Sequence, residues 1–229
     1  MKKLGNQPAH EDDQLLSVKV WDLPTRLFHW LLVALVVASF VTGNIGGNLM
    51  AYHMWSGYGT LALVLFRLAW GFAGGQQSRF SSFLRGPGTV ACYTTDFIKG
   101  DSKPYLGHNP LGGWSIIAML LALLVQVGTG LFANDEIFTE GPLYPLVSKD
   151  VSDWLTDIHL INRFILMFLL VVHVFAVFYY LFAKDENLLK PMITGVKKWR
   201  GPTEVSTGNP WWATIIAGLA AGVVYLLVV

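Results

Sequence analysis

The chain has 229 residues, of which 53% are hydrophobic and 14% charged, and its mean hydropathy is positive. An ordinary soluble domain carries roughly a quarter charged residues, so this composition argues against a soluble globule and for a membrane protein in contact with lipid. The formal net charge of +1 gives no reason to expect a nucleic acid partner.

The single cysteine, Cys92, limits the redox centres that the chain can hold. One thiol excludes an intramolecular disulfide, a CxxCH covalent haem site and a cysteine-ligated iron–sulfur cluster. Any redox centre must therefore use other side chains.

The predicted elements begin with a polar segment over 1–20, which has no apolar stretch of signal-peptide length. After it come five apolar segments of about the 20 residues that a helix needs to cross a bilayer. No internal repeat is visible. We predict an all-α membrane protein with a cytoplasmic tail (1–20), a four-helix core (21–185), and a cytoplasmic linker with a fifth helix (186–229). The predicted spans are 27–43, 53–72, 113–132, 155–183 and 211–229.

Lysine and arginine are distributed unevenly between the predicted loops. Thirteen of them precede the first span, separate the second from the third, or separate the fourth from the fifth, and all these segments fall on one side. The other side has Lys149 alone. The positive-inside rule then places the N-terminus in the cytoplasm and the C-terminus in the periplasm of a bacterial inner membrane.

The predicted outer loop between the third and fourth spans is acidic. It is either a solvated loop or a docking face for a periplasmic redox protein that charge steers towards it. Its acidic residues are Asp135, Glu136, Glu140, Asp150, Asp153 and Asp157.

Four histidines lie within or at the ends of the apolar spans: His29, His53, His159 and His173. Ionisable side chains inside spans are costly and usually mark function. His159 and His173 are fourteen residues apart, close to four helical turns, so they share a face and are separated by about 21 Å along the axis. One helix can thus contribute a ligand to each of two stacked sites.

With the N-terminus inside, His29 matches His173 in depth near the cytoplasmic face, and His53 matches His159 near the outer face. One such histidine alone would more often be a packed, hydrogen-bonded residue, but two pairs at matched depths favour cofactor ligation between helices. Copper or zinc would need further ligands that the spans lack nearby. Two histidines fill both axial positions of a haem iron, so we predict two haem b groups held by these pairs.

Two arginines, Arg67 and Arg163, lie near the predicted haem sites. Arg67 follows His53 by fourteen residues, at the depth of the cytoplasmic pair, and Arg163 lies one turn after His159. Guanidinium groups bind carboxylates well, so both are candidates for haem propionates. The alternative for Arg67 is snorkelling to lipid headgroups.

His108 lies in the run GHNP at 107–110, at the cytoplasmic entry to the third span. It either helps to cap that helix or handles protons near a bound quinone. Several glycines allow either close helix packing or the approach of a macrocycle, and no role is assigned to them. These glycines are Gly43, Gly57, Gly59, Gly71, Gly128 and Gly130.

Three runs of sequence are distinctive: VWDLPTR at 20–26 followed by FHW at 28–30, GHNPLG at 107–112, and the apolar segment that carries His159 and His173. Together they resemble the bacterial cytochrome b561 family, which includes the b-type cytochrome subunits of membrane-bound nickel–iron hydrogenases. The resemblance covers about 18–185 and implies a di-haem, quinone-linked electron carrier whose irons are held by the same four histidines. Compact members of the family have four spans, so the fifth departs from that pattern.

The predicted function is electron transfer across the membrane between the quinone pool and a periplasmic redox partner, of hydrogenase or multihaem cytochrome type. The chain would serve as an electron-transfer subunit of an oxidoreductase complex in a respiratory chain, without bond chemistry by its side chains. Two alternatives are a self-contained oxidoreductase that passes electrons from superoxide or another small reductant to quinone, and a membrane anchor or proton-relay transporter.

Overall fold

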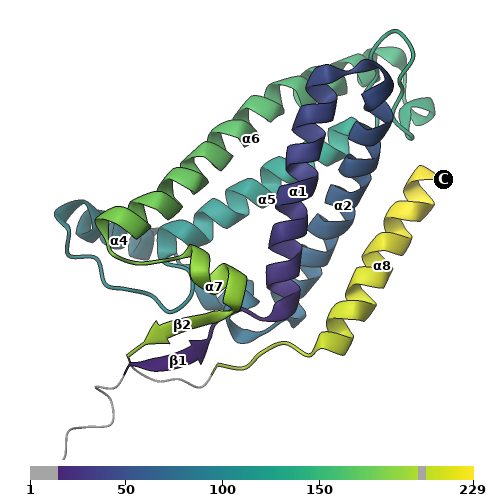
Figure 1. The fold of residues 1–229 in the computed structure, drawn as a ribbon. Coiled ribbons are helices and arrows are strands. Elements are labelled where there is room, and N and C mark those ends of the chain that lie inside the picture. The colour runs from purple at the N-terminus through teal and green to yellow at the C-terminus, as the bar shows by residue number, and fades with distance from the viewer. Residues whose placement is uncertain (1–14, 201–204) are drawn as a thin grey trace, which may run out of the picture.

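The computed structural model describes residues 15–200 and 205–229; positions 1–14 of the predicted tail lie outside the described residues. Two long helical hairpins form the body of the molecule, α1 with α2 and α5 with α6, and α8 lies along α2 (Figure 1). The long helices are α1 (Leu23–Ile45), α2 (Met50–Ala73), α5 (Pro110–Gly130), α6 (Lys149–Ala183) and α8 (Pro210–Val228).

The long helices begin one to six residues earlier than the apolar stretches predict. The reason is local capping, because a polar first turn is helical when a side chain satisfies its free N–H groups. Four of the helices start in this way, and proline occupies the first turn of α1, α5 and α8. The capping side chains belong to Asp22, Asn109, Ser148 and Asn209.

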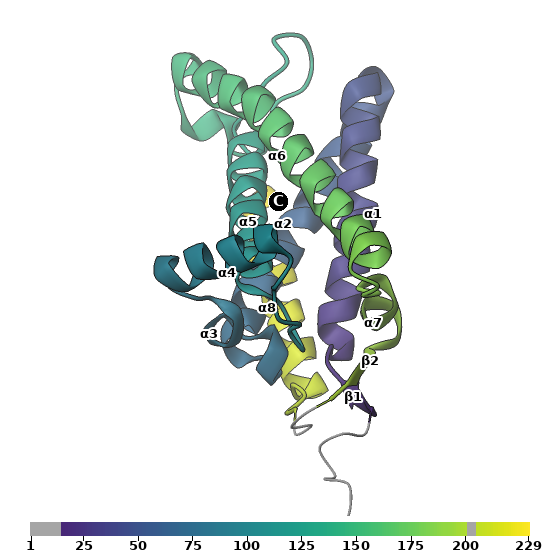
Figure 2. The same ribbon diagram turned by 90° about the vertical axis from the view of Figure 1, so that its left-hand side faces the viewer.

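The short elements gather at the two ends of the bundle (Figures 1 and 2). One end, here called the loop end, carries η2 (Gly47–Leu49) and the connection 131–148 with η4 (Tyr144–Leu146). The other, here called the ribbon end, carries the strands and the remaining short helices. These are β1 (Leu16–Lys19), η3 (Gln76–Ser78), α3 (Phe80–Phe83), α4 (Pro87–Lys99), α7 (Leu189–Thr194) and β2 (Val196–Trp199).

The two strands form an antiparallel ribbon in which Ser17 lies opposite Lys198. The backbone N–H of Val20 then donates to the carbonyl of Gly195 (2.8 Å), which continues the contact to the start of α1. An all-α chain was predicted, and this ribbon corrects that prediction: each strand has only four residues, too few for a clear period-two pattern. The segments before α1 and after α6 therefore lie at the same end of the bundle.

Within the described residues, four helices are long and apolar enough to cross a membrane: α1, α5, α6 and α8. Helix α2, which corresponds to the predicted second span (53–72), has 24 residues but is not among them. It packs against α1, α5 and α8, and its polar residues Ser56, Thr60 and Arg67 are all less than 9% exposed. A helix so enclosed can carry polar side chains because they face protein rather than lipid.

The apolar core lies between the two hairpins and under α3. Val64 in α2, Leu123 in α5 and Leu166 in α6 belong to one buried cluster, and Trp70 joins α2 to α8 in a second. Figure 2 shows α6 running obliquely across the bundle, from the side of α5 at the loop end to the side of α1 at the ribbon end. This crossing brings α6, which pairs with α5 in its own hairpin, close to α1 as well (Figure 2).

Candidate functional site

The structure brings the four predicted ligands together as two pairs. The ring centroids of His53 and His159 are 6.1 Å apart at the loop end, and those of His29 and His173 are 6.4 Å apart towards the ribbon end. A metal lies about 2 Å from a coordinating imidazole nitrogen, so two rings that share one iron have centroids about 6 Å apart. Both separations fit an iron between the rings.

The donor set fits haem better than a small metal ion. Within the described residues there is no group of three or more histidine, cysteine, aspartate or glutamate side chains placed to hold a metal. Structural zinc requires four protein ligands and catalytic zinc three, whereas a haem iron requires only two axial ligands from the protein.

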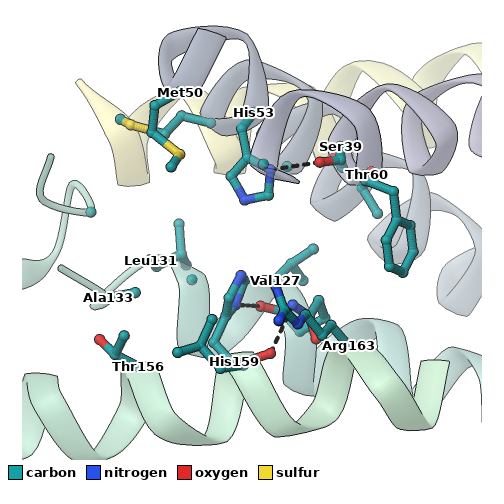
Figure 3. A pocket seen from close by; sticks show the side chains of 18 of the residues that line it. Ser39, Met50, His53, Thr60, Val127, Leu131, Ala133, Thr156, His159 and Arg163 are labelled. Atoms are coloured by element: carbon teal, nitrogen blue, oxygen red, sulfur yellow. Dashed lines mark hydrogen bonds between the residues drawn. The ribbon is translucent and has the colours of Figure 1, made fainter. Parts of the chain in front are cut away.

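Both rings of the loop-end pair are fixed by their outer nitrogens. Nδ1 of His53 lies 2.9 Å from the carbonyl oxygen of Ser39, and Nδ1 of His159 lies 2.9 Å from that of Gln126. A nitrogen that faces a carbonyl must donate, so Nε2 keeps its lone pair. Figure 3 shows the two rings pointing towards each other from α2 and α6.

A cavity of about 350 Å³ surrounds the loop-end pair, within the range of about 300–1,000 Å³ that is typical of ligand pockets. Its walls come from α1, α2, α5, α6 and the 131–148 connection, and they are mostly apolar. Gly57, one turn after His53, lines this space, and a Cβ at that glycine would meet nothing within 4 Å. Arg163 also lines it, with its guanidinium 4.7 Å from the ring of Phe164.

Arg67 lies at the ribbon end, where it is only 4% exposed. Its guanidinium carbon is 4.9 Å from the ring of Phe80, and one terminal nitrogen is buried without a hydrogen-bond partner in the described structure. The snorkelling alternative is therefore wrong, because the side chain is enclosed by protein. A buried cation is costly unless it is paired and fully hydrogen-bonded, so the nitrogen without a partner fits an anionic group such as a propionate.

His108 is also buried at the ribbon end, near Arg67. Its ring packs against those of Trp21 (4.6 Å between centroids) and Phe83 (5.0 Å), and its Nδ1 has no partner among the described residues. Burial, helped by the positive charge of Arg67, lowers the pKa of His108 to about 3. The capping alternative is wrong, because Asn109 supplies the cap of α5 through Gly112 N–H (2.7 Å).

Asp22 has a role that sequence reasoning missed. Its buried carboxylate accepts the N–H groups of Thr25 (2.9 Å) and Gly75 (3.2 Å), the hydroxyl of Ser78 (3.1 Å) and the indole N–H of Trp70 (3.4 Å). It thus joins the start of α1 to the end of α2 at the ribbon end. The available signal was an aspartate before Leu-Pro at the start of an apolar run, which is an ordinary N-cap pattern.

The acidic connection at the loop end is partly ordered by its own charges. Asp135 accepts the backbone N–H groups of Ile137, Phe138 and Thr139 at 2.7–2.9 Å, and Lys149 pairs with Glu136 and Asp153. Two apolar side chains stand out from the tip of this turn: Ile137 is 73% exposed and Phe138 is 96% exposed.

Comparison with known proteins agrees with this geometry. The family model described as prokaryotic cytochrome b561 matches residues 20–195. Similar proteins include the probable Ni/Fe-hydrogenase B-type cytochrome subunits of Azotobacter vinelandii (27% identity, 80% of this chain and 88% of that protein) and Rhizobium leguminosarum bv. viciae (25%, 80% and 90%). The corresponding protein of Bradyrhizobium diazoefficiens is 22% identical over 80% of this chain and 87% of its own length. No solved structure shows a significant match. The chain belongs to the prokaryotic cytochrome b561 family, and is thus a membrane-embedded haem b protein of electron transport.

Proposed function

We propose that this chain is a di-haem cytochrome b that carries electrons across the bacterial inner membrane between the quinone pool and a periplasmic redox protein. One observation carries the proposal: two facing imidazole pairs, with centroids 6.1 and 6.4 Å apart, each of which takes one ligand from α6. Because these two ligands are fourteen residues apart, the sites are separated by about 21 Å along that helix.

Haem b, when bound, supplies a one-electron redox centre at each pair. The chain's own residues hold and tune these centres. The pairs His53/His159 and His29/His173 would hold the two haem irons through imidazole nitrogens, the apolar walls would exclude water, and Arg67 and Arg163 would offset the charge of propionates. Two histidines at each iron would leave no free position for oxygen, which would suit these centres to electron transfer.

The ribbon supports five crossings of the membrane, with α2 among them. Residues 16–19 and 196–199 pair directly, so an even number of crossings must separate them. Helices α1, α5 and α6 alone would give three, and α2 supplies the fourth. Helix α8 then leaves the C-terminus on the opposite side, and the charge distribution places the N-terminus in the cytoplasm.

We infer a quinone site at the ribbon end, next to His29 and His173. His108 is buried there, one of its ring nitrogens has no hydrogen-bond partner among the described residues, and its depressed pKa keeps it neutral near pH 7. A neutral imidazole can donate a hydrogen bond to a quinone oxygen. Trp21 and Phe83 provide apolar walls beside it.

We infer that the periplasmic partner docks at the loop end. Six carboxylates face one lysine in this region, which favours a partner with a positive surface. Ile137 and Phe138 add an exposed apolar tip, and such side chains commonly anchor interfaces. The relatives carry the name of hydrogenase subunits, which supports a redox enzyme of that type as the partner.

The test is a haem count with a reduced-minus-oxidised visible spectrum of the detergent-purified protein. We expect two haems b, and His173→Ala should remove the ribbon-end haem while His53→Ala removes the loop-end haem. A protein without haem would overturn the proposal and favour a proton relay. Retention of both haems in His173→Ala would refute the pairing.

Purification in mild detergent tests the partner. A redox protein that co-purifies, and is lost when Phe138 is replaced by aspartate, would support docking at the loop end. Full quinone-linked activity of the chain without any other protein would favour the self-contained oxidoreductase.

A further inference from the structure

The two hairpins hold the loop-end histidines in the same way, although the sequence shows no repeat. In α1, the carbonyl of Ser39 receives the ring N–H of His53, and Gly43 lies one turn later. In α5, the carbonyl of Gln126 receives the ring N–H of His159, and Gly130 lies one turn later. Each histidine is thus bound by the preceding helix of its own hairpin.

The glycines make this contact possible. In a helix the Cβ of a residue points towards the N-terminus and covers the preceding turn, so a side chain at position i+4 would cover the carbonyl of residue i. A Cβ at Gly43 would lie 2.7 Å from Nδ1 of His53, and one at Gly130 would lie 3.0 Å from Cε1 of His159. The rings occupy the space that a side chain would otherwise fill.

A second set of contacts repeats around each ring. The residue before each glycine is a threonine whose hydroxyl donates to a carbonyl four residues earlier, Thr42 to Ala38 (2.6 Å) and Thr129 to Val125 (2.7 Å). Thr129 also lies 3.3 Å from Nδ1 of His159.

The residue whose carbonyl accepts the ring N–H also forms a side-chain hydrogen bond with the helix that carries the histidine. Ser39 bonds Ser56 (2.6 Å), three residues after His53. Gln126 bonds Asn162 (2.7 Å), three residues after His159. The same four-part arrangement therefore occurs twice, with different side chains in the polar pair.

We propose that Gly43 and Gly130 form two matched cradles that position the loop-end histidines. Each cradle fixes the tautomer, by directing Nδ1–H to a carbonyl, and fixes the plane of the ring. The outcome is an interplanar angle of 86° between His53 and His159. The proposal rests on the assignment of these two histidines as axial ligands.

The ribbon-end pair lacks this support. Nδ1 of His29 is buried without a partner in the described structure, and the rings of His29 and His173 make an angle of 56°. A carbonyl that accepts the outer N–H raises the basicity of a ligating imidazole, and a more basic ligand favours the ferric iron. The cradles therefore distinguish the two haems by lowering the reduction potential of the one at the loop end.

Gly130→Ala and Gly43→Ala test the cradles in the haem-loaded, detergent-purified protein. Alanine is a better helix former than glycine by about 1 kcal/mol, so the substitution does not weaken the helix itself. We expect a changed EPR signal for the loop-end haem, because that signal depends on the angle between the imidazole planes. Its reduction potential should rise, and its retention should weaken by about tenfold or more.

The matched control is Gly128→Ala, in the same turn of α5, where an added Cβ meets nothing within 4 Å. It should leave the EPR signal and both potentials unchanged. Gly43→Ala should act more strongly than Gly130→Ala, because its Cβ would come closer to the ring. If Gly43→Ala does not load haem, Gly130→Ala and the nearly isosteric Thr129→Val test the proposal instead, and both should change the EPR signal of the loop-end haem.

A wild-type EPR signal and potential in Gly130→Ala would overturn the proposal, and so would an equal change in Gly128→Ala. The ribbon-end haem serves as an internal reference and should not change in any of these variants. Failure of the cradles is separable from failure of the proposed function, because the wild-type haem count and the His53→Ala spectrum test ligation independently.

Discussion

At the scale of single residues, the ribbon-end site is marked by polar atoms that the protein leaves without partners. One terminal nitrogen of Arg67 and Nδ1 of both His29 and His108 are buried without a hydrogen-bond partner within the described structure, as is Nε of Arg26. Native proteins rarely leave such groups unpaired unless they have a role. By contrast, Asp22 in the same region is saturated by four donors. The proposed haem and quinone would supply partners for the atoms of Arg67 and His108.

Removal of the Arg67 charge should lower the reduction potential of the ribbon-end haem. A reduced haem is one unit more negative than the oxidised form, so a nearby cation stabilises it. We expect Arg67→Met to lower the potential by about 60 mV, which corresponds to a tenfold change in a one-electron equilibrium. Spectroelectrochemical titration measures this shift.

The control is Arg85→Met, because Arg85 is exposed at the ribbon end and binds the carbonyl of Ser82 (2.7 Å). This variant should leave both potentials unchanged. An equal shift in the two variants would show that Arg67 acts only through general surface charge.

Asp135 makes the stability of the turn at 135–139 depend on pH. Backbone N–H groups, first that of Thr139 and then those of Ile137 and Phe138, hold the pKa of its carboxyl below the ordinary 3.8. Because the folded-state pKa is depressed, the ionised carboxylate stabilises the turn fully above pH 3.8, and this stabilisation is lost as the pH falls below that value. The carboxylate is exposed, so the effect is modest.

Hydrogen exchange checks this expectation. At pH 6, Asp135→Asn should reduce the protection of the amides of 137–139 by about threefold to tenfold, since charge-assisted hydrogen bonds are the stronger kind. Asp150→Asn, at an exposed position in the first turn of α6, is the control. Equal protection in the wild type and Asp135→Asn would show that the turn is held by other contacts.

At the scale of elements, the ribbon and the central helix decide the topology. The β1 and β2 pairing joins segments that are far apart in sequence, and α2 is surrounded by three other helices. Hydropathy marks 53–72 as an apolar segment, but it shows neither the strand pairing nor the enclosure of this helix by the others. Short strands carry little periodic signal, and an enclosed helix need not be as apolar as one that faces lipid.

A cross-link across the ribbon tests its register. In a Cys92→Ser background, Ser17→Cys with Lys198→Cys places two thiols directly opposite each other, within the about 4.5–5.5 Å between Cβ atoms that short cross-linkers span. We expect efficient cross-linking, visible as a band of altered mobility after cleavage between the two positions. The pair Ser17→Cys with Lys197→Cys is the control, because neighbouring residues of a strand point to opposite faces. Equal yields in both pairs would contradict the register.

At the scale of the whole molecule, charge and fold together define the two sides. The ribbon end carries the basic segments, and the loop end carries the acidic connection with its exposed tip. The outward faces of α6 and α8 are apolar and exposed, as lipid contact requires. Residues that illustrate this are Phe164, Phe168, Phe175, Leu219 and Leu226.

The native cysteine reports the orientation. Cys92 is exposed in α4 at the ribbon end, so a membrane-impermeant maleimide should label it only after spheroplasts are permeabilised. Phe138→Cys in a Cys92→Ser background should be labelled in intact spheroplasts, because the proposed orientation places the loop end in the periplasm. The reverse pattern would invert the proposed orientation.

The sequence by itself determined the membrane character of this protein, its long helices and its four candidate ligands. Apolar runs and capping residues are local signals, and a histidine in an apolar span is conspicuous because burial there is costly. The predicted orientation and the depth of each histidine in its span then paired His29 with His173 and His53 with His159. The structure brings the rings of each pair close together, with centroids 6.4 and 6.1 Å apart.

Only the tertiary structure decided what surrounds those ligands. The carbonyls that bind His53 and His159 come from residues 14 and 33 positions away, and no local pattern reports which carbonyl a missing Cβ leaves uncovered. The burial of Arg67 and the four donors to Asp22 likewise depend on helices that meet at one end of the bundle. Every residue has a backbone carbonyl, and a glycine is compatible with many roles, so the sequence does not show which of them contact the histidine rings. Packing of the helices decides this.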